Sequence, residues 1–361
     1  MNKASSKIKI ADTVLFLVLF VLFSCMTFML FNRQTHSFTV IPSEEYINVI
    51  ENNIYPSDMG YYVLEIEGAQ SRYSYPYPVF FVTGKLFSLF TDSRTGLAIA
   101  TVLFNSLALL LLKIYLMRYA ETEGLKYFGT TLIALSLMTL SMLYTPPGIY
   151  LPGIRYKYVG VFTPNPFHNA TYMAARPFAI VAFFSFVRLL KIYENSPIRE
   201  NIREYLIFAI SLLLSTMTKP SYAIVHIGTA GIIMLYRLCK NRFTNIIPTI
   251  CLGLCFVPTF ADLIYQYSGV FTQSMGEEAY TERGIGIGFG EVWRDYCGNI
   301  PLAICLAMAF PLCVFLIDRV FFRSKEMPEE RLSLQMYIMS FLMTFFLYEK
   351  GFRKADFNFS W

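Results

Sequence analysis

The chain has 361 residues, of which 55% are hydrophobic, 17% aromatic and only 15% charged, whereas about 25% charged residues is usual for a water-soluble domain. This composition excludes a soluble two-domain enzyme, a disordered scaffold and a disulfide-built secreted module. The formal net charge of +5 is small, so the positions of the cations along the chain carry more information than their sum. We expect an integral membrane protein with no nucleic-acid partner.

Nine apolar segments are candidate transmembrane helices, because a hydrocarbon core of about 30 Å needs roughly 20 mostly apolar residues per helix. The sequence therefore predicts an all-α, polytopic membrane protein in which residues 1–361 form a single transmembrane domain. We interpret the first segment as a retained anchor, since no small-residue cleavage site follows it. The nine segments lie near Ile10–Phe31, Gly96–Met117, Tyr127–Tyr144, Met173–Leu190, Tyr205–Thr218, Tyr222–Tyr236, Ile246–Tyr265, Pro301–Phe321 and Leu334–Tyr348.

The distribution of lysine and arginine predicts the orientation of these segments. With the N-terminus in the cytoplasm, more than half of the 30 cationic residues fall in short inner loops and flanks, as the positive-inside rule requires. This placement needs a hairpin that turns on the outer side at Lys219-Pro220-Ser221, where proline suits a sharp turn. We expect a multi-pass protein of the bacterial plasma membrane.

The non-membrane parts of the chain then lie mainly on the outer face. Three outer loops are expected, at residues 32–95, 145–172 and 266–300. In the third, Gly284–Gly290 alternates glycine with other residues and is interpreted as a flexible loop, because no βαβ unit surrounds it. The chain ends on aromatic residues without a polar tail, which is compatible with a truncated open reading frame whose later helices are missing.

The first outer loop holds the leading candidate for a catalytic acid. Ser57-Asp58 opens a predicted helix, Met59–Ala69, so Asp58 lies near a helix N-terminus. Two interpretations of Asp58 carry similar weight, a cap of that helix and a functional carboxylate. An aromatic stretch that includes Tyr75 and Tyr77 follows, and it leads into Val79–Phe90, which predicts a short interfacial helix.

Cations near the outer ends of the spans are candidates for binding an anion. Arg176 lies one turn inside a predicted span, next to His168 and Asn169, and its guanidinium matches phosphate with paired donors. Lys219, at the tip of the hairpin, and Arg353, near the end of the chain, are the other two. The alternative for Arg176 and Lys219 is snorkelling to the headgroups, with about the same weight.

Metal binding is not supported by the pattern of histidines. His36, His168 and His226 have no ligand spacing, and a zinc site is rejected.

Together these features resemble the GT-C superfamily of polytopic glycosyltransferases. The motifs that carry the resemblance are Ser57-Asp58-Met59, Tyr75-Pro76-Tyr77-Pro78, His168-Asn169-Ala170-Thr171-Tyr172 with Arg176-Pro177-Phe178, and Thr218-Lys219-Pro220-Ser221. As an architecture, the resemblance covers nearly the whole chain, and each motif within it is short. The sequence departs from the family in one respect. Many relatives carry an acidic pair close behind the first helix, whereas Asp58 lies well after that helix in this chain. The pair Glu44-Glu45 lies nearer to the first helix.

The resemblance implies transfer of a sugar from a polyprenyl-phosphate carrier to a glycan, lipid or protein acceptor on the extracytoplasmic face. It assigns Asp58 as the catalytic base, and it assigns Lys219, Arg176 and Arg353 to the donor phosphate. His168, Asn169, Tyr75 and Tyr77 would contact the substrate. No cofactor is implied, and a divalent metal is needed by some relatives and not by others.

Proteins of other classes fit the same sequence less well. A polysaccharide polymerase or ligase of the outer face would share the lipid-linked substrates and the long outer loops. A transporter would place ionisable residues near mid-span, where this chain has few. A non-catalytic membrane scaffold is the third alternative.

Overall fold

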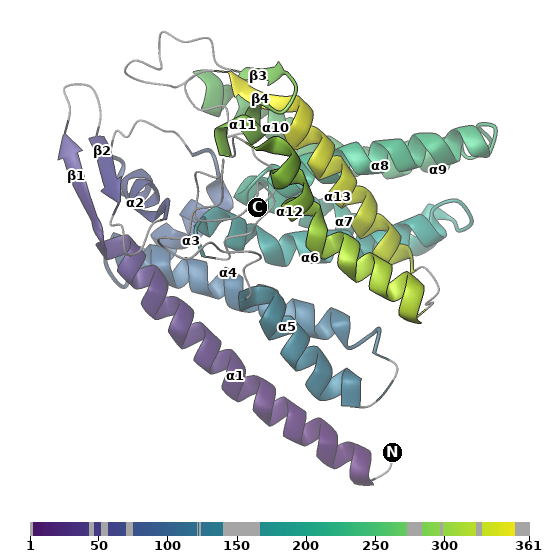
Figure 1. Cartoon of the computed structure of the whole chain (residues 1–361), viewed down its shortest axis with the longest axis horizontal. Coiled ribbons are helices and arrows are strands. Elements are labelled where there is room, and N and C mark those ends of the chain that lie inside the picture. The colour runs from purple at the N-terminus through teal and green to yellow at the C-terminus, as the bar shows by residue number, and fades with distance from the viewer. Residues whose placement is uncertain are drawn as a thin grey trace. The chain divides into compact units, whose positions relative to one another are not determined.

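The computed structural model is predominantly helical and carries two small two-stranded sheets (Figure 1). Residue contacts divide the chain into two compact units. Unit 1 comprises Met1–Leu140, Pro166–Ala182 and Ser211–Lys219, and unit 2 comprises Ser141–Asn165, Phe183–Ile210 and Pro220–Trp361. The structure describes residues 3–42, 47–51, 57–69, 75–120, 122, 124–139, 167–272, 284–296, 299–322 and 327–350.

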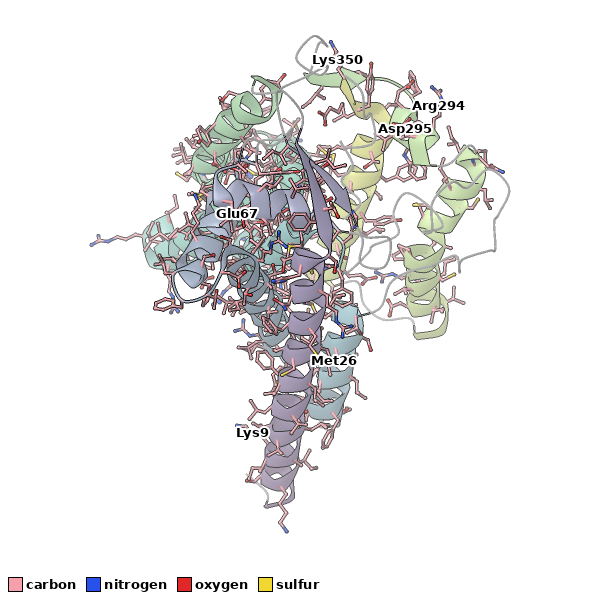
Figure 2. The ribbon with its side chains drawn as sticks, turned by 90° about the vertical axis from the view of Figure 1, so that its left-hand side faces the viewer. Lys9, Met26, Glu67, Arg294, Asp295 and Lys350 are labelled. Carbon is pink, nitrogen blue, oxygen red and sulfur yellow. The ribbon has the colours of Figure 1, made fainter. Side chains whose placement is uncertain are left out.

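The long helices of unit 1 are α1 (Lys3–His36) and α4 (Ser93–Leu116), followed by the π-helical turn η1 (Leu125–Gly129) and α5 (Thr130–Thr139). Phe16, Phe23, Ala108, Leu109, Ala134 and Met138 form the buried core shared by α1, α4 and α5. Other apolar side chains of α1 face outward, and Met26, labelled in Figure 2, is 65% exposed. A helix that exposes so many apolar side chains suits a lipid environment.

The segment between α1 and α4 folds into short elements on the same unit. Strands β1 (Phe38–Pro42) and β2 (Ile47–Glu51) pair antiparallel, with Phe38 opposite Glu51. Helices α2 (Met59–Glu67) and α3 (Pro78–Ser88) confirm the two short helices predicted for this loop, within about two residues. The strand pair was not foreseen.

Close packing fixes these short helices against α4. Tyr62 and Phe80 are fully buried in a core with Leu97, and a Cβ at Gly84 would lie 2.6 Å from Ile66 Cδ1, so α3 approaches α2 closely at this glycine. The part of unit 1 that holds α2 and α3 is therefore a packed structure built around aromatic residues.

Helices α6 (Ala170–Ile192) and α7 (Ile198–Thr218) contribute residues to both units. Unit 2 also contains α11 (Glu291–Tyr296), α13 (Pro328–Phe346) and a strand pair. Its remaining elements are α8 (Ser221–Lys240), α9 (Ile246–Leu254), α10 (Val257–Thr272), α12 (Ile300–Ile317) and the π-helical turn η3 (Asp318–Phe322).

The strand pair of unit 2 corrects one prediction. Gly284–Ile287 forms strand β3, which pairs antiparallel with β4 (Leu347–Lys350), so the expectation of a flexible loop is wrong for these four residues. A Cβ at Gly286 would overlap the Tyr348 ring, so the small residue lets that ring lie against the strand.

By length and composition, four of the described helices can cross a membrane, namely α1, α4, α6 and α8. The number rises to six if two bent helix pairs each form one span: α9 with α10, and the two halves of α12, Ile300–Ala309 and Pro311–Val320, of which the second runs into η3. These helices indicate a membrane protein. Each of the nine apolar segments predicted from the sequence overlaps one of the helices, but the count of nine spans stays a prediction.

Candidate functional site

Asp58 stands at the N-terminus of α2, but its side chain does not cap the helix. The neighbouring Ser57 accepts a hydrogen bond from the Met59 backbone N–H at 3.3 Å instead. Asp92, at the N-terminus of α4, shows the contrast, because its carboxylate accepts from the backbone N–H groups of Arg94 and Thr95. Asp58 thus occupies the N-cap position without a capping hydrogen bond from its side chain, and its carboxylate faces elsewhere; its functional role stays a prediction.

The Asp58 carboxylate faces the start of α6. Asn169 Nδ2 donates a hydrogen bond of 2.6 Å to Asp58 Oδ2, and His168 Nε2 lies 3.7 Å from Asp58 Oδ1. The Asp58 backbone N–H also donates to the carbonyl oxygen of His168 at 3.4 Å. About a third of the Asp58 side chain, 32%, stays accessible, so a substrate hydroxyl can reach it.

The amide of Asn169 is oriented by the helix that it caps. Its Oδ1 accepts from the Thr171 hydroxyl at 2.7 Å and from the Tyr172 backbone N–H at 3.2 Å. Because the oxygen faces the helix, the Nδ2 group faces Asp58. Asn169 therefore holds the Asp58 carboxylate in place.

Tyr62 is a buried core residue close enough to the Asp58 carboxylate to be affected by its charge. It is 1% exposed, and its hydroxyl lies 3.4 Å from Thr171 Oγ1. Burial and, next, the charge of Asp58 raise the pKa of the Tyr62 hydroxyl well above its usual value. The Tyr62 hydroxyl therefore stays neutral at neutral pH.

Lys219 is half-buried between two aromatic rings. Its ammonium nitrogen lies 5.0 Å from the centroid of the Tyr77 ring and 5.3 Å from that of the Tyr172 ring. No carboxylate pairs with Lys219 among the residues that the structure describes. The rings stabilise the cation without neutralising it, so its charge stays available to an anion.

Arg176 is a second cation with few partners. The half-buried side chain donates one long hydrogen bond, from Nη1 to Asn105 Oδ1 at 3.4 Å, and within the described ranges it makes no ion pair. A guanidinium carries five N–H donors. Most of its donors are therefore open to an anion or to water.

One face of α6 connects these side chains. Asn169, Tyr172 and Arg176 are spaced by three and four residues, so they follow one another along the same side of the helix over roughly 10 Å. Asp58 contacts the first, Lys219 lies over the second, and Arg176 is the third. The structure thus places the predicted acid and two of the three predicted cations along one helix face.

The other predicted site residues have different surroundings. Tyr75 packs edge-on against Tyr62 with ring centroids 4.9 Å apart, and Tyr77 is 8% exposed with its ring toward Lys219. Tyr77 therefore supports the cation, and Tyr75 belongs to the aromatic core. Arg353 lies outside the described residues. Within those residues no group of three or more His, Cys, Asp or Glu could hold a metal ion.

Sequence reasoning missed two contributors to the site. The sequence motifs give Tyr172 no role of its own, and they do not include Asn105. The signal for Asn105 was present, because it is an amide within a largely apolar span, where polar side chains are expensive. Tyr172 carries no comparable signal, since tyrosine is common at membrane interfaces.

No protein-family model, no curated protein and no solved structure matches this chain. A function can therefore be argued only from the residues and contacts described above.

Proposed function

We propose that the chain is a membrane glycosyltransferase that moves a sugar from a polyprenyl-phosphate-linked donor to an acceptor on the extracytoplasmic face. The observation that carries the proposal is the order of groups along α6. A carboxylate free of capping stands at its start, and Lys219 and Arg176 follow within two turns. Such a transfer needs a base at one end of the reacting bond and positive charge at the other.

The groups suit each part of the reaction. Asp58 takes the proton of the acceptor hydroxyl, whose oxygen forms a new bond to the anomeric carbon of the sugar. The bond from that carbon to the phosphate oxygen breaks, and its electron pair leaves with the polyprenyl phosphate. The phosphate gains one negative charge in this step, which Lys219 and Arg176 stabilise. Asp58 releases its proton to water afterwards.

The membrane arrangement supports the proposal at a coarser level. Helix α3 and the turn after it expose Val82, Leu86, Leu89 and Phe90 by 54–86%, which suits a helix lying at the lipid surface. We include in the proposal the GT-C-like topology of nine spans, with the N-terminus in the cytoplasm of a bacterial cell. The apolar helices would then accommodate the polyprenyl tail.

The test is sugar transfer by the purified protein in lipid, with a polyprenyl-phosphate sugar as donor. Asp58→Asn should lower turnover by roughly 100-fold to 10,000-fold, the range typical of a lost general base. Asp92→Asn is the matched control, because Asp92 is also an aspartate at a helix start but lies outside the site. Turnover of Asp58→Asn at the wild-type level would remove the base from the mechanism.

The length of the product separates this function from its nearest alternative. A single added sugar is expected for the proposed transferase, whereas long products would indicate the polysaccharide polymerase or ligase. Absence of transfer with any polyprenyl-linked donor would favour a transporter or scaffold.

A further inference from the structure

Asn105 is an unusual residue for its position. It lies near the middle of α4, is fully buried, and its Nδ2 group has no hydrogen-bond partner within the described residues. A buried amide donor without an acceptor is costly, and native structures rarely retain one without a reason.

The neighbouring polar residues of α4 do not share this property. The Thr101 hydroxyl donates to the Leu97 carbonyl of its own helix at 2.8 Å. Ser106 Oγ lies 2.8 Å from Ser24 Oγ on α1. Asn105 therefore stands apart from two buried neighbours whose hydrogen-bonding groups are used within the protein.

The orientation of the Asn105 amide follows from Arg176. A guanidinium has only donors, so the oxygen of the amide must face it, as the 3.4 Å contact from Nη1 to Oδ1 shows. The Nδ2 group consequently points away from Oδ1, and it is buried without an acceptor. Arg176 and Asn105 together present unpaired N–H donors next to a positive charge.

We propose that Asn105 and Arg176 form a binding site for a phosphate monoester, in which Asn105 Nδ2 donates to one phosphate oxygen while the guanidinium binds another. This inference rests on the proposed function and deepens it, because it makes Asn105 a residue that binds the departing polyprenyl phosphate. An anion is favoured over a neutral ligand because the unpaired groups of both side chains are donors and one carries a full positive charge.

The experiment measures binding without sugar transfer. Purified full-length protein in nanodiscs is titrated with polyprenyl phosphate, and protein in phosphate-free detergent is titrated with inorganic phosphate. Asn105→Leu should weaken binding by roughly tenfold to a hundredfold, the value of a hydrogen bond to a charged group. Asn105→Asp should weaken it more, because the new carboxylate pairs with Arg176 and repels the phosphate.

Two further variants keep the result interpretable. Ser106→Ala removes a buried polar group from the same helix and should bind as the wild type does. Asn105→Asp has nearly the shape of the wild type, so it tests the site even if Asn105→Leu fails to fold.

The outcomes separate this inference from the proposed function. Binding that depends on Asn105 in either titration supports the site, and the titration in which it occurs identifies a lipid-borne or a free phosphate. Unchanged affinity of both Asn105 variants in both titrations overturns the inference, even if the protein transfers sugar. Binding that depends on Asn105 in a protein without any transfer activity keeps the site and removes the transferase.

Discussion

Two cations, Lys113 on α4 and Arg176 against it, have completely different surroundings. Lys113, near the C-terminal end of α4, donates to Asp12 Oδ2 at 2.9 Å, to the Tyr127 carbonyl oxygen at 2.6 Å, and to the hydroxyls of Thr130 and Thr131 at 2.9 and 2.7 Å. Arg176, roughly 12 Å away along the helix at Asn105, donates one bond of 3.4 Å. The first cation has an acceptor for each of its protons, and the second has donors to spare.

This difference distinguishes a structural charge from one that is available to a ligand. The Lys113 ammonium is neutralised by Asp12, which itself accepts from Thr131 at 2.7 Å, and together they connect α1, α4 and α5. A buried pair of this kind leaves nothing for a substrate. Arg176 has no such counter-charge within the described ranges, so its charge stays available to an anion.

The largest expected effect comes from removing Lys113, the cation whose donors all have acceptors. Lys113→Met leaves Asp12 as an uncompensated buried charge and should lower the free energy of unfolding by about 3–5 kcal/mol. Denaturant or thermal unfolding in detergent measures this. The double variant Asp12→Asn/Lys113→Met removes both charges and should recover much of the loss, while phosphate affinity per folded molecule should not change.

Arg176→Met should behave in the opposite way. No carboxylate loses a partner, so stability should change by less than about 1 kcal/mol or even rise. Binding of polyprenyl phosphate should fall by about 1.5–3 kcal/mol, the value of a charged hydrogen bond, as a titration would show. A loss of stability equal to that of Lys113→Met would end the distinction between the two cations.

A smaller effect is expected at the ring that supports Lys219. Tyr172→Leu removes one of its two cation–π contacts and should weaken donor binding by about 0.5–2 kcal/mol, seen as a raised KM with turnover nearly unchanged. Tyr172→Phe keeps the ring and should match the wild type. If Phe and Leu behave alike, the ring does not position the lysine.

The smallest expected effect on stability comes from removing the Asp92 side chain. This side chain caps α4, whereas the Asp58 side chain makes no capping hydrogen bond. Asp92→Ala should cost about 1 kcal/mol of stability at pH 7. Hydrogen bonds from the side chain and then the backbone N–H of Thr95 lower the pKa of Asp92. Its contribution is therefore complete above the unfolded value of about 3.9 and is lost as the pH falls through the lower folded value.

Unfolding of both proteins over a range of pH checks this prediction. The difference in stability between the wild type and Asp92→Ala should shrink at acid pH. Asp58→Asn, at the start of α2, removes no capping hydrogen bond and should show no comparable loss of stability.

Much of the fold was predictable from the sequence, but less of the site. The apolar segments and the two short helices near Asp58 all correspond to helices, because the length of an apolar run and its charged flanks are local properties. Strands β3 and β4 were missed, since pairing of Gly284–Ile287 with Leu347–Lys350 depends on residues far apart in the chain. Short strands of this kind leave little local pattern.

What the sequence by itself determined is a helical membrane protein with a few isolated charges at the ends of its apolar segments. Only the tertiary structure decided which charges are free to act. Asp58 and Asn169 are 111 residues apart, and Arg176 and Asn105 are 71 apart, yet each pair is in contact. The physical reason is that the availability of a charge depends on which partners packing brings to it, and no local pattern specifies those partners.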